Sequence, residues 1–212
     1  MIILGLTGSI GMGKSNAAAT LRRLGVPVFD ADAEVHRLLG PGGAAVRPVE
    51  ALFAGVRDEA GGIDRRRLGR LVFGDPPARR RLEGILHPMV QRAEKRFVAQ
   101  ARTRREPLVV LDIPLLFESG GIERCDLALV VSAPLRLQRE RVMRRPGMSE
   151  DRFAGILRAQ MPDREKRRRA DFVVATALGR SVTFRRLKAI VRTLRQGPPP
   201  RRHRGEKPCA RS

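Results

Sequence analysis

The sequence predicts an α/β fold in which helices cover both faces of a parallel β-sheet, giving three layers, with a smaller helical lobe attached. Short apolar runs of strand length alternate with longer stretches of helical periodicity. These runs are continuously apolar, as strands buried on both faces of a parallel sheet are. A chain of 212 residues is long enough for one sizeable core with a small lobe, but not for two large domains.

Five short apolar runs are expected to form the strands. The second run leads into Asp30-Ala31-Asp32 and the third ends in Asp112, so both carry carboxylates at their carboxyl ends. The runs cover residues 2–7, 26–29, 108–111, 127–131 and 172–174.

Helices are expected between these strands. The stretch from Lys14 to Leu24 has apolar residues spaced for one buried face, and Gly25 ends it. Residues 33–105 look mostly helical; Pro76-Pro77 can open a helix there, and Pro88 is expected to start a long one that reaches about Arg105. Further helices are expected at 135–144, 149–160, 163–170 and 181–195.

The chain is strongly basic, with 43 Lys and Arg against 22 Asp and Glu and a net charge of +21. Only five of the basic residues are lysines. Two explanations stay open. An arginine-rich and lysine-poor chain can reflect genomic base composition, and a basic surface also suits a nucleic acid, a nucleotide or a multiply phosphorylated metabolite.

Composition argues against several classes of protein. The longest apolar stretches fall short of the roughly 20 residues that a membrane span needs. The apolar N-terminus has no basic region before it and is not expected to be a signal peptide. Cys125 and Cys209 cannot form a disulfide framework or a zinc site, so a cytoplasmic location is expected.

Residues Gly8 to Ser15 match the phosphate-loop pattern G-x-x-x-x-G-K-[ST] at every fixed position. The motif follows a predicted strand and opens a predicted helix, which is the context that its mechanism needs. Glycines let backbone N–H groups surround a phosphate, and the helix N-terminus adds positive potential. Lys14 can then reach the β- and γ-phosphates of a nucleoside triphosphate, and the Ser15 hydroxyl can bind Mg²⁺.

Three carboxylates follow the predicted strands. Asp112 lies at the carboxyl end of a buried strand, the edge that faces the ligand crevice in open α/β sheets, and is predicted to hold Mg²⁺. If the chain stays extended, Asp30 and Asp32 point to the same side and suit a kinase that must orient an acceptor hydroxyl and take its proton. The equal alternative is that Asp32 caps the helix that follows it.

A group of arginines precedes Pro146-Gly147 and predicts a mobile lid that neutralises a transferring phosphoryl group. In so arginine-rich a chain, a merely solvated helix face is an equal alternative. His87-Pro88 stands before a predicted helix, and a capping role for His87 is favoured over a ligand contact. The arginines are Arg139, Arg141, Arg144 and Arg145.

Several segments, taken in order along the chain, resemble the dephospho-CoA kinase family. The phosphate loop alone is generic, whereas the Asp-Ala-Asp, His-Pro and Pro-Leu-Leu-Phe-Glu segments in this order are specific. The resemblance covers about residues 2–195. Its segments are Leu6–Ser15, Val28–Asp32, Leu86–Pro88, Asp112–Glu118, Gln138–Arg145, Ala159–Gln160 and Lys166–Asp171.

The resemblance implies a three-layer P-loop NTPase core of residues 1–32 and 106–195, with a lid at about 140–165. It implies a helical substrate-binding lobe at 33–105, and leaves a basic tail at 196–212 that is expected to be disordered. The implied reaction is the Mg²⁺-dependent transfer of the ATP γ-phosphoryl group to the 3′-hydroxyl of dephospho-CoA. That reaction is the last step of coenzyme A synthesis.

The resemblance also implies roles for individual residues. Asp32 matches the family's proposed base, and Arg141 and Arg145 match its lid arginines; with Lys14 they form the predicted catalytic set. The predicted ATP-binding residues are Gly8, Gly11, Met12, Gly13, Lys14, Ser15 and Asn16. Predicted to border the substrate are Thr7, Asp32, His87, Leu115, Leu116 and Phe117, and Ser15 and Asp112 are predicted to hold Mg²⁺.

The chain departs from the family pattern at three places. Asn16 stands where a threonine usually follows the loop serine, and its amide can still donate to a phosphate. Val174–Ala177 replaces a common Asp-Asn pair near the adenine, so the adenine contacts at Ala175 and Thr176 are left open. Pro146-Gly147 replaces a more acidic lid segment.

Two other function classes stay open. Another small-molecule P-loop kinase would share the core and differ only in the 33–105 lobe and the 114–118 segment. A nucleic-acid-dependent ATPase would suit the +21 charge, but aromatic residues are only 4% of the chain, so stacking platforms are few. A GTPase is disfavoured because no Asn-Lys-x-Asp sequence occurs. We expect ATP and dephospho-CoA as partners, neither membrane nor nucleic acid, and a monomer or weak homo-oligomer.

Overall fold

The computed structural model describes residues 1–197, which form two compact units. The first unit contains Met1–Phe29 and the chain from Ala101 onward, and the second contains Asp30–Gln100. The elements are β1 (Ile2–Thr7), α1 (Lys14–Arg23), β2 (Val28–Asp30), α2 (Ala31–Leu39), α3 (Val46–Leu52), α4 (Arg65–Val72), α5 (Pro76–Thr103), β3 (Leu108–Asp112), the 3₁₀ helix η1 (Gly121–Arg124), β4 (Leu127–Ser132), α6 (Leu135–Met143), α7 (Glu150–Ala159), α8 (Asp163–Arg169), β5 (Phe172–Ala175) and α9 (Arg180–Gln196). From residue 198 on, the predicted tail lies outside the described residues.

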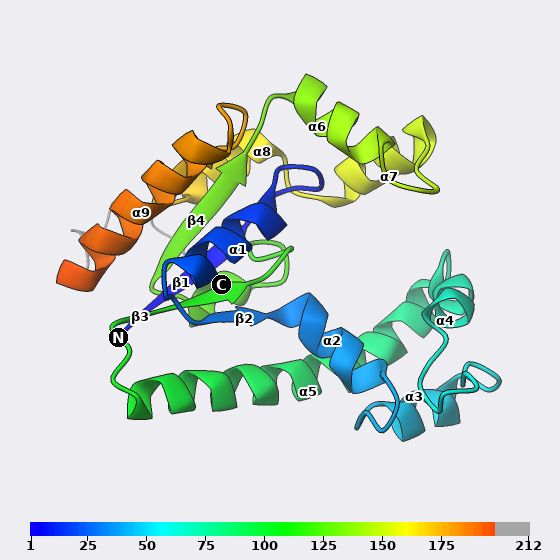
Figure 1. Cartoon of the computed structure of the whole chain (residues 1–212). Helices are drawn as coiled ribbons and strands as arrows, with labels where there is room; N and C mark the ends of the chain where they lie inside the picture. The colour runs from blue at the N-terminus through cyan, green and yellow to red at the C-terminus, as the bar shows by residue number, and fades with distance from the viewer. Residues whose placement is uncertain (198–212) are drawn as a thin grey trace, which may run out of the picture. The chain divides into compact units, whose positions relative to one another are not determined.

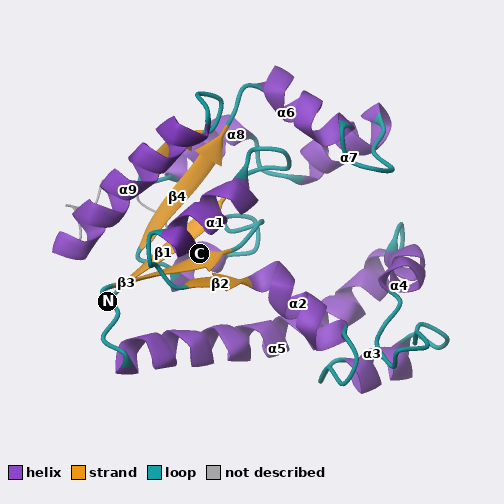
Figure 2. Ribbon diagram, in the orientation of Figure 1, coloured by secondary structure: helices purple, strands orange, loops and turns teal. Residues whose placement is uncertain are grey.

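The five predicted strands are confirmed, and they form one sheet in the order β2-β3-β1-β4-β5 (Figures 1 and 2). β1 pairs in parallel with both β3 and β4, and β4 pairs in parallel with β5. The strand order reverses beside β1, since the chain moves to one side of it for β3 and to the other for β4. At such a switch point the loops at the carboxyl ends of the strands diverge and leave a crevice for a ligand.

One face of the sheet packs against α1 and α9, which are neighbours (Figure 1). Alternate residues of β1, such as Leu4 and Leu6, point to this side because successive side chains of a strand lie on opposite faces. The apolar residues of α1 recur at helical spacing, so Ala17 and Leu21 bury the same helix face. This layer forms the main core of the first unit.

The opposite face of the sheet is covered by the segment that follows β3. Leu116 and Cys125 lie so close to Gly5 that a β-carbon there would stand 2.8 Å from Leu116 Cδ2 and 2.9 Å from Cys125 Sγ. A larger residue at this position of β1 would therefore displace buried side chains. The same face of β4 contacts α8, so both sides of the sheet are covered and the predicted three-layer α/β fold is confirmed.

The second unit consists, after the end of β2, mainly of helices and loops (Figure 2). Its own core combines apolar side chains of α2, α3, α4 and α5, including Leu38, Val49, Leu68 and Leu86. Glycines between α2 and α3 punctuate the stretch as expected: Gly43 N–H donates to the Gly40 carbonyl in a tight turn.

The prediction that Pro88 starts a helix is wrong. α5 begins at Pro76 and continues through Pro88 to Thr103. Pro88 has no N–H to donate to the preceding turn, and its ring crowds the carbonyl there, at a cost of about 3 kcal/mol. The helix persists because apolar side chains on both sides of Pro88 pack into one cluster; they are Leu82, Ile85, Leu86, Met89 and Val90.

Two expectations for the second strand are also corrected. The chain does not stay extended from Asp30 to Asp32, because α2 begins at Ala31. Nor does Asp32 cap the helix: Asp30 is the N-cap, and its Oδ1 accepts from the Ala33 N–H at 3.0 Å. Asp32 is exposed in the first turn, where its negative charge also suits the positive end of the helix dipole.

Replacing Gly5 with alanine is expected to destabilise the protein. The added methyl meets two buried side chains, and overpacking of this kind costs about 1–3 kcal/mol of unfolding free energy. Urea denaturation followed by circular dichroism measures the loss. Gly155→Ala in α7 is the matched control, because no atom lies within 4 Å of its new β-carbon; it should leave stability unchanged or raise it by about 0.5–1 kcal/mol. A Gly5→Ala protein as stable as wild type would contradict the packing argument.

Candidate functional site

The loop between β1 and α1 is held close to neighbouring backbone. A β-carbon on Gly8 would stand 2.8 Å from the Val131 carbonyl oxygen. Gly11 has a φ of +74°, and a β-carbon there would stand 2.8 Å from the Gln138 carbonyl oxygen. Larger residues would be excluded at both positions, so the glycines of the motif are required by the fold as well as by a phosphate.

The loop presents a set of backbone donors with no acceptor among residues 1–197. Met12 N–H donates within the loop to the Ser9 carbonyl at 3.1 Å. In the described part of the chain, no oxygen accepts from the N–H groups of Gly11, Gly13, Lys14 or Ser15. The last two are at the N-terminus of α1, where the helix dipole adds positive potential. Such a set of donors forms an anion-binding site.

Lys14 and Asp112, both predicted from the sequence as site residues, form an ion pair. Lys14 Nζ lies 2.7 Å from Asp112 Oδ1, and Asp112 is almost completely buried. The sheet register explains the contact, because Leu6 of β1 pairs with Asp112 at the end of β3. Ser15 and Asn16 are exposed on the first turn of α1.

The residues predicted to border the substrate beside Asp112 are mostly packed. Thr7 is fully buried, and its Oγ1 donates to the Pro114 carbonyl at 2.9 Å. Leu116 is fully buried against Gly5, and Phe117 is buried too. Leu115 alone of the three apolar residues is half-exposed.

The four arginines of the predicted lid are in different environments. Arg139 pairs with Glu150 and Arg144 with Glu140, so carboxylates balance both. Arg141 donates to the Gly11 carbonyl and to two oxygens of Thr176. Arg145 is exposed, and no carboxylate of the described residues pairs with it. Arg139 and Arg141 lie on α6, and Arg144 and Arg145 follow its end, before the Pro146-Gly147 turn that leads to α7.

Two glutamines contact the loop, and sequence reasoning missed their part in the site. Gln138 Nε2 of α6 donates to the Ile10 carbonyl at 2.7 Å, and Gln160 Oε1 accepts from the Ile10 N–H at 3.1 Å. Both glutamines also line a cavity of about 630 Å³ beside the loop. A neutral amide carries no charge or periodicity signal, so only the tertiary structure reveals these contacts.

A buried ion pair joins the segment after β3 to α8. Lys166 is fully buried, and its Nζ lies 2.8 Å from Glu118 Oε1, which also accepts from the Met161 N–H. Partial burial raises the pKa of the Glu118 carboxyl, but the hydrogen bonds from Lys166 and Met161 outweigh it, and the pKa is lowered below its ordinary value of 4.5. The carboxylate form is therefore favoured in the folded protein.

Asp32 and His87 belong to the second unit. Asp32 is exposed in the first turn of α2, and His87 is exposed in the interior of α5. The capping role favoured for His87 is therefore wrong, since no helix begins there.

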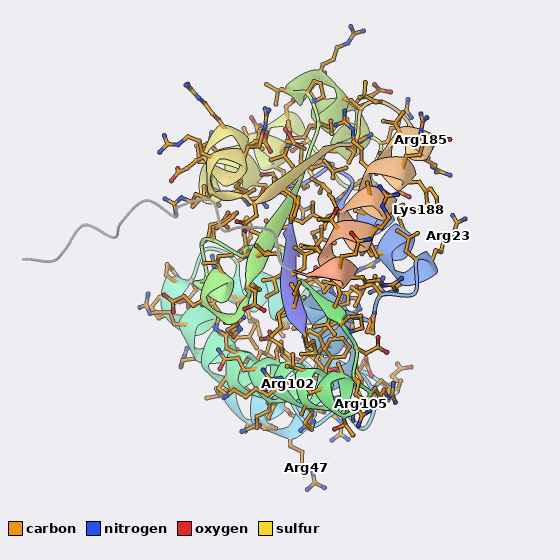
Figure 3. All side chains as sticks on the ribbon, turned by 90° about the vertical axis from the view of Figure 1, so that its left-hand side faces the viewer. Arg23, Arg47, Arg102, Arg105, Arg185 and Lys188 are labelled. Atoms are coloured by element: carbon orange, nitrogen blue, oxygen red, sulfur yellow. The ribbon has the colours of Figure 1, made fainter. Side chains whose placement is uncertain are left out.

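Several exposed basic residues lie on helices outside the loop. Arg23 of α1 and Arg185 and Lys188 of α9 are exposed on neighbouring helices (Figure 3). The Arg23 guanidinium stands 5.9 Å from the centroid of the Phe184 ring. Abundant surface arginine does not by itself mark the site, which is distinguished by its loop geometry.

Residues 1–197 contain neither a membrane-spanning helix nor a cluster of metal-binding side chains. None of the helices there is long and apolar enough to cross a membrane. Within the same residues, no three His, Cys, Asp or Glu side chains gather closely enough to enclose a metal ion by themselves.

A parallel sheet with a phosphate loop at its switch point, and a lysine of that loop beside a strand-end aspartate, defines the class of P-loop nucleotide-binding proteins. Comparisons with known proteins are specific about the family. The family model described as dephospho-CoA kinase matches residues 2–179. The chain belongs to the dephospho-CoA kinase family, and is thus an enzyme of the transferase class.

Individual relatives agree with this assignment. The chain is 59% identical to a dephospho-CoA kinase of Paramagnetospirillum magneticum, over 94% of this chain and 93% of the relative. It is 54% identical to one of Rhodospirillum rubrum, over 92% of this chain and 93% of the relative. A solved structure from Thermus thermophilus has a TM-score of 0.77 at 42% identity, covering 91% of this chain and 97% of that chain. A dephospho-CoA kinase from Campylobacter jejuni has the same fold, with a TM-score of 0.65 at 24% identity over 92% of this chain and 98% of that one.

The Glu118–Lys166 pair predicts a loss of stability in acid. Because the folded pKa of Glu118 is lowered, its contribution is complete above the ordinary value of 4.5 and is lost as pH falls through the folded pKa. Unfolding free energies measured in urea between pH 3 and pH 7 should fall less steeply with acid for Glu118→Gln than for wild type. Glu165→Gln on α8, whose partner Arg169 is exposed, is the control and should keep the wild-type slope. Equal slopes for wild type and Glu118→Gln would refute the assignment.

Proposed function

We propose that this chain transfers the γ-phosphoryl group of ATP to the 3′-hydroxyl of the ribose in dephospho-CoA, giving coenzyme A and ADP. The observation that carries the proposal is the loop of free amides beside Lys14, in a chain 59% identical to a named dephospho-CoA kinase. The remaining steps assign roles to the residues around that loop.

The loop binds the phosphates of ATP. The N–H groups of Gly11, Gly13, Lys14 and Ser15 donate to the phosphate oxygens, because no acceptor within residues 1–197 competes for them. Lys14 reaches the β- and γ-phosphates and exchanges part of its contact with Asp112 for them. Gly8 and Met12 shape the loop, and the exposed Asn16 amide is available as a further donor.

Ser15 and Asp112 hold Mg²⁺ together with the phosphates. A hydroxyl and a carboxylate are oxygen ligands of the kind Mg²⁺ prefers, and this metal usually takes only one or two protein carboxylates alongside substrate phosphates. The fit is supported by the place of both residues next to Lys14: one follows it in α1, and the other pairs with it. The ion, when bound, neutralises charge on the phosphate oxygens.

Asp32 orients the acceptor. Its carboxylate accepts the proton of the 3′-hydroxyl while the new bond from that oxygen to the γ-phosphorus forms. The bond between the γ-phosphorus and the bridging oxygen breaks, and ADP leaves with the electron pair. An exposed carboxylate at the head of a helix is accessible to a bound substrate. Of the residues predicted to border that substrate, His87 is exposed and Leu115 is half-exposed, so these two are available to it, whereas Thr7, Leu116 and Phe117 are buried.

Arg141 and Arg145 supply positive charge from α6 and the turn after it. Phosphoryl transfer has a loose transition state with charge spread over the equatorial oxygens, so positioning and neutralisation account for most of the catalysis. Arg145 has no carboxylate partner within residues 1–197, and Arg141 is held at the loop. We further propose a cytoplasmic location, and a monomer or weak homo-oligomer.

A coupled assay of ADP release tests the proposal. With ATP and Mg²⁺, the purified protein should turn over dephospho-CoA at least 100-fold more efficiently than any nucleoside monophosphate, and EDTA should abolish turnover. A difference of that size is about 2.7 kcal/mol of transition-state stabilisation. If a nucleoside monophosphate were turned over with comparable efficiency, the proposal that dephospho-CoA is the substrate would be wrong. Turnover that rises steeply with added RNA would favour a nucleic-acid-dependent ATPase.

Lys14→Ala should lower kcat about 10²–10³-fold, because it removes a charge that stabilises the transferring phosphoryl group. The change also takes the lysine partner from the buried Asp112 carboxylate, so the variant should be less stable. The double variant Lys14→Ala/Asp112→Asn should regain stability, measured by thermal denaturation. Its turnover, measured by steady-state kinetics, should stay low. Recovery of both together would mean that Lys14 acts only through folding.

Asp32→Asn should lower kcat about 10²–10⁴-fold, as loss of a general base does, while ATP affinity changes less than twofold. Stopped-flow turnover and isothermal titration with ATP measure the two effects. Glu34→Gln is the matched control, since it removes a charge from the same helix turn at a residue paired with Arg37. Near-normal turnover of Asp32→Asn would exclude Asp32 from the mechanism.

A further inference from the structure

Three consecutive carbonyls of the phosphate loop accept hydrogen bonds from side chains outside the loop. The donors come from α6 and from the residue that follows β5, so two separate parts of the chain hold the same loop. The pairs are Gln138 Nε2 to the Ile10 oxygen at 2.7 Å, Arg141 Nη1 to the Gly11 oxygen at 3.3 Å, and Thr176 Oγ1 to the Met12 oxygen at 2.8 Å.

These contacts fix where the amides of the loop point. A trans peptide is planar, and its C=O and N–H point in opposite directions. Holding the Ile10 carbonyl on Gln138 therefore turns the Gly11 N–H to the other side. Holding the Met12 carbonyl on Thr176 does the same for the Gly13 N–H. Both N–H groups are among the donors without an acceptor in the described residues.

The side chains of Thr176 and Gln138 are buried where they make these contacts. Thr176 is 6% exposed and Gln138 2%, so water does not replace the hydrogen bonds they make. Thr176 Oγ1 also accepts from Arg141 Nη1 at 3.0 Å, and the Thr176 carbonyl accepts from Arg141 Nη2 at 3.0 Å. The Thr176 side chain stands against Gly13, where a β-carbon would lie 3.2 Å from its Oγ1.

We infer that Thr176 and Gln138 are positioning residues for ATP, which hold the carbonyls of Met12 and Ile10 on the outer side of the phosphate loop so that the amides behind them face the phosphates. The inference rests on the proposed binding of ATP phosphates by this loop. Neither side chain touches the reacting atoms. Without them, the loop loses its preformed geometry and part of the binding energy goes into ordering it.

Thr176→Val tests the hydroxyl, because valine keeps the shape and removes the donor. The Kd for ATP, measured by titration calorimetry, should rise about 10-fold, which is the size of effect expected when a buried carbonyl loses its only side-chain donor. The KM for ATP should rise with it, and the KM for dephospho-CoA should stay within twofold. Thr176→Ser keeps a hydroxyl and should restore ATP affinity to within about threefold of wild type.

Thr183→Val is the matched control. Thr183 is equally buried, and its hydroxyl donates to the Gly179 carbonyl in α9 and not to the loop. This variant should lose stability like Thr176→Val but keep wild-type ATP affinity. A structural role alone would lower the melting temperature of both threonine variants and leave ATP affinity of the folded protein unchanged.

Gln138→Met removes the side-chain donor to the Ile10 carbonyl, so it tests the inference independently of Thr176. It also provides the test if Thr176→Val does not fold. It should also raise the Kd for ATP about 10-fold. The inference is overturned if either folded variant binds ATP within twofold of wild type, or if Thr176→Ser binds as weakly as Thr176→Val. Failure of the proposed function has a different signature: wild-type protein and Lys14→Ala would then bind ATP equally poorly.

Discussion

A backbone amide can serve a phosphate only if the carbonyl on the other side of its peptide is satisfied elsewhere, and the rest of this structure depends on that constraint. In the loop from Gly8 to Ser15, the Ser9 carbonyl accepts from the Met12 N–H, but the carbonyls of Ile10, Gly11 and Met12 accept from donors outside the loop. Side chains from α6 and from the end of β5 supply the missing donors. Gln138 and Arg141 are three residues apart on one helix, so a single face of α6 provides two of them.

The sheet order places charge where the loop needs it. β1 lies between β3 and β4, and the register of β1 with β3 sets Asp112 beside the start of the loop. The pair of Lys14 with Asp112 is buried, and burying two charges costs desolvation that their attraction barely offsets. We interpret the pair as positioning Lys14: Asp112 holds the Lys14 ammonium group at the switch point, where a negatively charged ligand can compete with Asp112 for that group.

Arginine abundance and arginine function are separate matters in this chain. Of the four arginines predicted as a lid, two are balanced by glutamates, one bonds to the loop and one is exposed. Many others, such as Arg23 and Arg185, lie on helix surfaces (Figure 3). A carboxylate partner competes with a phosphate for the same guanidinium, so Arg139 and Arg144 are less available to a phosphate than Arg145, which has no carboxylate partner among the described residues.

The sequence by itself determined the local features. Apolar runs predicted every strand, the glycine spacing predicted the phosphate loop, and the order of motifs predicted the family, because each of these depends on residues close together in the chain. It misjudged Pro88 and the Asp30–Asp32 segment, where helix packing and helix capping outweighed local preference. The sequence did not predict that Gln138, Gln160 and Thr176 bond to the phosphate loop, since the loop residues that they contact are more than a hundred positions away. Only the tertiary structure could decide their part, because a hydrogen bond depends on where two distant backbones meet and not on the composition of either.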